Sequence, residues 1–63
     1  MNGIELITAC DKQVDIEDIV IKKGSVGTLI DVNIEDGRVL FLLDFEEAGT
    51  FEWFSQDELE EKF

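Results

Sequence analysis

The pair Asp36-Gly37 constrains the fold more than any other feature of the chain, because it separates two strand-like runs. The runs cover residues 26–34 and 39–45 and are rich in β-branched, leucine and phenylalanine residues. An Asp-Gly pair between such runs favours a two-residue type I′ turn, in which Glu35 faces Arg38. The sequence therefore predicts a β-hairpin at the centre of the chain.

This turn also predicts which residues share a face of the hairpin. On one face the pairs are almost wholly apolar, as a core face should be: Ile34 with Val39, Val32 with Phe41, Ile30 with Leu43, and Thr28 with Phe45. The opposite face is mixed, with Asn33 opposite Leu40, Asp31 opposite Leu42, and Leu29 opposite Asp44. We expect the first face to pack in the core and the second to face outward.

Weaker signals surround the hairpin. Alternating apolar positions and β-branched residues predict a strand over residues 3–9, polar residues 10–18 predict a long loop, and residues 19–21 form a short apolar run. Residues 46–50 are typical of a turn, and residues 51–54 of another short strand. Ser55-Gln56-Asp57-Glu58 has the spacing of a capping box and predicts a short helical turn, after which Leu59 and Phe63 are spaced to face the core.

Length and cysteine content limit how such a chain is stabilised. With 63 residues it is predicted to form one domain over residues 1–63 with a small core. Cys10 is the single cysteine and histidine is absent, so neither an intramolecular disulfide nor a usual zinc site is expected. The lone thiol and a start without signal-peptide character point to the cytoplasm. No apolar run is long enough to cross a bilayer.

Charge narrows the class of partner. The chain has 16 acidic and 5 basic side chains, a net charge of -11, yet 44% of its residues are hydrophobic, which favours a folded domain over a disordered acidic tract. Binding to a nucleic-acid backbone or an anionic membrane needs clustered basic residues, and Lys22-Lys23 is the one adjacent pair. We expect neither, and instead a protein partner with a basic surface.

The segment from Lys23 to Val32 resembles the KGxVGTxxDV strand of small SH3-like-barrel domains. The resemblance continues through Arg38-Val39-Leu40-Phe41, Asp44-Phe45 and Ser55-Gln56-Asp57-Glu58-Leu59. Such domains occur as bacterial and phage proteins of unassigned function, and similar barrels include the variable chain of ferredoxin:thioredoxin reductase. The resemblance implies an all-β SH3-like barrel of about five short strands with a C-terminal helical turn. It implies no catalytic residues.

Catalysis and cofactor binding have little support in the sequence. Histidine and tyrosine are absent, and nothing beside Cys10 would activate its thiol, so no catalytic residue is assigned. The segment starting at Asp31 begins like a calcium-binding loop, but Asp36 stands where that loop needs glycine and Leu42 where it needs glutamate. No metal or cofactor is predicted.

Two sets of residues are candidates for contacts with other proteins. An acidic and aromatic set surrounds the last strand and suits a partner interface: Glu46, Glu47, Glu52, Trp53, Phe54, Asp57, Glu58 and Glu61. A set on the outer face of the hairpin suits self-association or cover by the chain end: Leu29, Leu40 and Leu42.

Three hypotheses for the function stay open. The first is a non-catalytic acidic module that docks on a partner protein or pairs with itself. The second is a phage or mobile-element nucleic-acid mimic, whose carboxylates occupy the basic groove of a DNA- or RNA-binding protein. The third is an accessory subunit of an enzyme.

Overall fold

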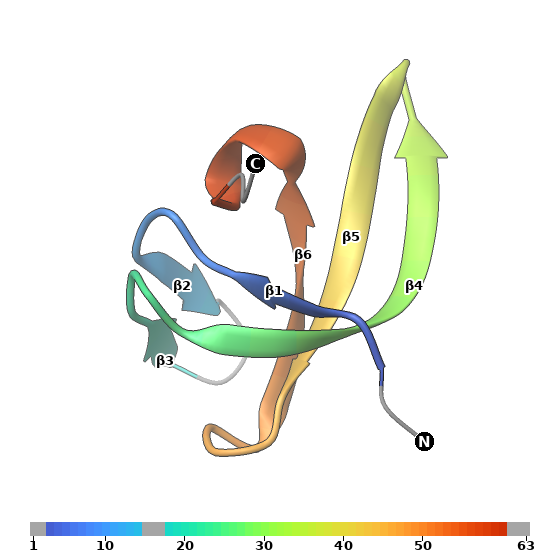
Figure 1. The fold of residues 1–63 in the computed structure, drawn as a ribbon. Helices are drawn as coiled ribbons and strands as arrows, with labels where there is room; N and C mark the ends of the chain where they lie inside the picture. Colours follow the sequence, from blue (N-terminus) through green and yellow to red (C-terminus); the bar gives the residue numbers. More distant parts are fainter. Residues whose placement is uncertain (1–2, 15–17, 61–63) are drawn as a thin grey trace.

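The computed structural model describes residues 3–14 and 18–60. They form six strands and one turn of 3-10 helix: β1 (Glu5–Ile7), β2 (Lys12–Val14), β3 (Ile19–Ile21), β4 (Val26–Glu35), β5 (Arg38–Phe45), β6 (Thr50–Ser55) and η1 (Gln56–Glu58). One antiparallel sheet has the order β1-β4-β5-β6, and β2 pairs with β3 alone (Figure 1). The predicted all-β class with a short helical turn after the last strand is confirmed.

The central hairpin has the predicted turn. Asp36 and Gly37 both have positive φ angles, 53° and 77°, as a type I′ turn requires. The predicted register is confirmed from the pair Glu35 and Arg38 down to the pair Asp31 and Leu42. The turn residues thus determine the pairing over the distal half of the hairpin.

Beyond Asp31 the predicted register is wrong. Leu29 lies opposite Leu43 and Thr28 opposite Asp44, so Ile30 is an additional residue on β4. The predicted pairs Ile30 with Leu43, Thr28 with Phe45, and Leu29 with Asp44 therefore do not form. Such a bulge bends a strand and increases its twist. Figure 1 shows β4 bending between the part beside β1 and the part in the hairpin.

The predicted loop over residues 10–18 is also wrong in part. Residues 12–14 form β2, which pairs antiparallel with β3 through Lys12 opposite Ile21 and Val14 opposite Ile19. Val14 is the one apolar residue of this strand and the one that is buried. A strand with a single apolar residue shows no clear alternation in its sequence. This strand brings the count in the described residues to six, where about five were expected.

The core lies between the curled sheet and the β2–β3 pair. Its buried members are Val14, Ile21, Leu43, Phe45, Phe54 and Leu59, with Leu6, Ile19, Leu29 and Phe41 packed against them. The rings of Phe45 and Phe54 meet edge to face, with centroids 5.6 Å apart. The core therefore draws on all six strands and on the segment after η1.

The segment after η1 returns to the first strand. Leu59 is buried and forms an isolated bridge with Thr8, just after β1. Two backbone bonds of 2.8 Å flank it, from Ala9 N to Glu58 O and from Glu60 N to Ile7 O. Leu59 thus faces the core as predicted, whereas Phe63 lies outside the described residues.

Candidate protein-docking surface

The hairpin extends beyond the strands that cover its base. β1 pairs with β4 as far as Thr28, and one further bond of 2.7 Å joins Leu29 N to Ile4 O. Residues 31–42, here called the distal hairpin, therefore project past β1 (Figure 1).

The inner face of the distal hairpin is apolar and uncovered. This is the face that carries Phe41, and it was predicted to lie in the core. Val32 is 49% exposed, Ile34 70% and Val39 39%. The prediction fails here because β1 has three residues and β4 has ten, so the first strand covers only the base of the hairpin.

An apolar groove continues from this face toward the body of the domain. It has a volume of about 400 Å³. Its walls are apolar apart from Gln56 and Glu60, and comprise Ile4, Leu6, Leu29, Val39, Phe41 and Leu59. The inner face and the groove thus form one apolar surface that is open to solvent.

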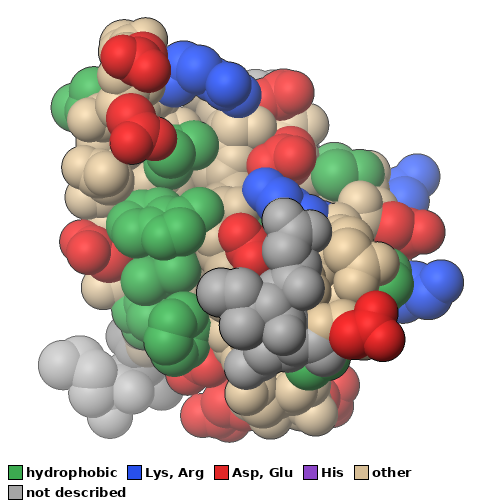
Figure 2. Space-filling model, turned by 180° about the vertical axis from the view of Figure 1, so that it is seen from behind, with side chains coloured by type: hydrophobic (Ala, Val, Ile, Leu, Met, Phe, Trp, Pro, Cys, Tyr) green, Lys and Arg blue, Asp and Glu red, His purple; other side chains and the backbone are tan. Residues whose placement is uncertain are grey.

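The outer face brings together members of both predicted sets. Leu42 lies opposite Trp53 and Leu40 opposite Ser55, and Phe51, which is 60% exposed, lies on the same face opposite Asp44. Leu40, Leu42 and Trp53 are half-buried. Figure 2 shows a strip of hydrophobic side chains with acidic residues around it, on the side of the molecule where the hairpin projects. The outer face is therefore mixed, because β4 contributes Asp31, Asn33 and Glu35 to it beside these apolar residues.

Leu29 does not belong to this outer face. The bulge at Ile30 places it opposite Leu43, and it packs against the core and lines the groove. The predicted self-association set is therefore reduced to Leu40 and Leu42.

The predicted acidic and aromatic set does not form one surface. Glu46 and Glu47 are exposed in the turn between β5 and β6, whereas Asp57 and Glu58 belong to η1 at the other end of β6 (Figure 1). Phe54 is fully buried in the core and is not accessible to a partner. Glu61 lies outside the described residues.

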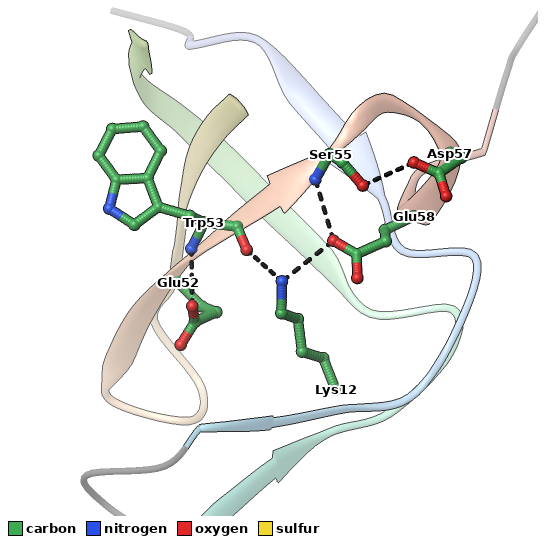
Figure 3. A network of polar contacts seen from close by, with 6 residues as sticks. All are labelled: Lys12, Glu52, Trp53, Ser55, Asp57 and Glu58. Atoms are coloured by element: carbon green, nitrogen blue, oxygen red, sulfur yellow. Dashed lines mark hydrogen bonds and ion pairs between the residues drawn. The ribbon is translucent and has the colours of Figure 1, made fainter. Parts of the chain in front are cut away.

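The edge of β6 that faces away from β5 is covered by side chains (Figure 3). The Trp53 N–H donates to Glu52 Oε2 at 3.1 Å, and the Ser55 N–H donates to Glu58 Oε1 at 2.9 Å. The Lys12 ammonium donates to the Trp53 carbonyl at 2.6 Å and to Glu58 Oε1 at 3.0 Å. Because these backbone groups already have hydrogen-bond partners, they are not available to pair with a further strand.

This network also changes the acidity of two carboxyl groups. Burial by itself would raise the pKa of Glu58, but the Ser55 N–H and the Lys12 ammonium outweigh it and lower that pKa below 4.5. The Ser55 hydroxyl donates to Asp57 Oδ1 at 2.6 Å and lowers the pKa of Asp57. The predicted capping box between Ser55 and Glu58 is thus present, with the Ser55 N–H donating to the Glu58 carboxylate.

The sequence did not predict the contacts of Lys12 or the exposure of Val32, Ile34 and Val39. Lys12 lay in a segment expected to be a loop, and its partners are more than 40 positions away in the chain. The three apolar residues carry the same alternation as a buried face, so no sequence signal separates them from the core.

Among residues 3–14 and 18–60 there is no group of three metal-binding side chains, and every buried side-chain polar atom has a hydrogen-bond partner. Within those ranges, no helix has the length and apolar character that crossing a bilayer requires.

Comparison of the chain with models of protein families, with curated proteins and with solved structures gave no match. The resemblance to SH3-like barrels therefore stays a prediction.

Proposed function

We propose that this chain is a non-catalytic protein-binding module whose contact surface is the distal hairpin. The observation that carries the proposal is that the inner face of the hairpin exposes Val32, Ile34 and Val39 to solvent in a molecule of net charge -11. Exposed apolar patches with polar rims mark interaction sites, whereas charge alone would serve solubility. Asp31, Glu35 and Asp36 lie on the same hairpin and supply an acidic rim.

The nucleic-acid-mimic hypothesis has less support. A mimic needs carboxylates arranged along one surface, but Glu46 and Glu47 lie at one end of β6 and Asp57 and Glu58 at the other (Figure 1). Glu58 is also paired with Lys12, which reduces its value as a phosphate substitute. The accessory-subunit hypothesis is a special case of protein binding and needs no different surface.

Site-specific photo-crosslinking in the native host tests the proposal. A photoreactive amino acid replaces Ile34 in one variant and Glu47, in the turn at the far end of β5, in a control variant. We expect a discrete crosslinked species from position 34 that is absent from position 47. Equal crosslinking from both positions, or none from position 34, would contradict a contact surface on the hairpin.

A further inference from the structure

The outer edge of β4 in the distal hairpin is an open strand edge. In a two-residue hairpin the residues flanking the turn, here Glu35 and Arg38, form the first hydrogen-bonded pair, and bonded pairs then alternate along the strands. The backbone groups of Ile34 and Val32 consequently point away from β5. The bond of 2.8 Å from Val32 N–H to Asp31 Oδ1 agrees with this direction.

No strand of the described residues pairs with this edge. β1 ends its pairing at Thr28, with one further bond at Leu29. The contrast with β6 is clear, since three backbone groups on the free edge of that strand are occupied by side chains (Figure 3). On β4 only the Val32 N–H has such a partner, within the part of the chain that the structure describes.

We propose that the open edge of β4 adds an extended segment of a partner protein, in which apolar and basic residues alternate. This inference rests on the proposed function and specifies how the partner binds. Strand addition obtains affinity from main-chain hydrogen bonds and specificity from the side chains that alternate on either side of the new strand.

The two faces of β4 determine the chemistry of the added strand. On the inner face it lies beside Val32 and Ile34 and next to the apolar groove, so its side chains there are apolar. On the outer face it lies beside Asp31, Asn33 and Glu35, so its side chains there are lysine or arginine. Asp31 leaves the Val32 N–H when a carbonyl of the new strand takes its place, and its carboxylate then pairs with a basic side chain.

A second copy of this chain is a poor occupant of the same edge. Antiparallel pairing of two β4 strands brings Asp31 and Glu35 of each copy close together, in molecules that each carry a net charge of -11. Like charges on adjacent strands are destabilising. A basic and apolar segment meets the same groups with opposite charge.

The test uses a short synthetic peptide of alternating lysine and valine residues. Binding is followed by backbone amide shifts and by fluorescence anisotropy, first to the unmodified protein and then to Ile34→Pro and Ile34→Val. Proline removes the outward N–H without breaking the ladder to β5, whereas valine keeps it. We expect Ile34→Pro to weaken binding about tenfold or more and Ile34→Val to bind within about threefold.

A second measurement tests strand addition without a variant of the protein, and so applies even if Ile34→Pro does not fold. The same peptide with alternate backbone nitrogens methylated is offered to the unmodified protein, and we expect it not to bind. A peptide with glutamate in place of lysine is expected not to bind either. Equal binding of the methylated and the plain peptide would overturn strand addition, and preference for the glutamate peptide would overturn the assigned chemistry.

Failure of this inference can be distinguished from failure of the proposed function. If position 34 still crosslinks to a partner while the lysine-valine peptide does not bind, the hairpin is the contact surface but strand addition is wrong. Sedimentation tests self-association at the same edge. If the unmodified protein is a dimer and Ile34→Pro is a monomer, a second copy of the chain occupies this edge, and the proposed partner is wrong.

Discussion

Replacement of Lys12 by methionine removes the ammonium group that joins β2 to β6 while keeping the apolar stem. The ammonium lies 2.6 Å from the Trp53 carbonyl and 3.0 Å from Glu58 Oε1, and 4.8 Å from the centre of the Phe54 ring. The side chains of Lys12 and Glu58 are only 27% and 29% exposed, so water replaces these contacts poorly. The change leaves the Trp53 carbonyl, on the edge of β6, without its donor, and leaves Glu58 with the Ser55 N–H as its remaining donor.

The expected loss is large compared with the stability of a domain this small. A hydrogen bond to a charged group contributes about 1.5–3 kcal/mol, an exposed ion pair up to about 1 kcal/mol, and an ammonium over a ring about 0.5–1 kcal/mol. These contributions share one group and are not additive, and partial exposure reduces them. We expect Lys12→Met to lower the free energy of unfolding by about 2 kcal/mol.

Urea unfolding followed by the fluorescence of Trp53, the single tryptophan, measures this loss. With a slope of about 1 kcal/mol per molar urea, the midpoint should fall by about 2 M. Lys22→Met is the matched control, because that side chain is exposed in a turn and its removal should change stability by less than about 0.5 kcal/mol. A loss below about 0.5 kcal/mol in Lys12→Met would refute the structural role assigned to the ammonium.

Three further predictions concern Glu58, Gly27 and Gly37. The lowered pKa of Glu58 means that its stabilising contribution is complete above pH 4.5 and is lost as the pH falls through the folded-state pKa. The free energy of unfolding, measured with urea at a series of acidic pH values, should therefore fall less steeply with decreasing pH in Glu58→Gln than in the unmodified protein. In Gly27→Ala the new Cβ would lie 2.8 Å from the Phe45 ring and 2.9 Å from Leu43 Cβ, and urea unfolding should show a loss of about 1–3 kcal/mol. Gly37→Ala places a Cβ at a φ of 77° and should lower the free energy of unfolding by about 1–2 kcal/mol in the same measurement, with amide shifts confined to the hairpin turn. An unchanged urea midpoint would contradict the type I′ assignment.

Local signals predicted the parts of the fold that neighbouring residues determine. Asp36 and Gly37 set the turn and, through it, the pairing as far as Asp31 and Leu42, because a two-residue turn permits one register. The spacing of Ser55 and Glu58 predicted the helical turn, since a capping bond spans only three residues. In both cases the interacting groups are close in the chain.

Contacts between distant segments decided the remainder. The bulge at Ile30, the pairing of β2 with β3, and the bonds from Lys12 to Trp53 and Glu58 all depend on how the sheet curls around the core. Apolar alternation in β4 and β5 marks a face that can be buried, but whether Val32 and Ile34 are buried depends on how far β1 reaches along β4. Because β1 stops at Thr28, the tertiary structure leaves that face and its strand edge exposed to solvent.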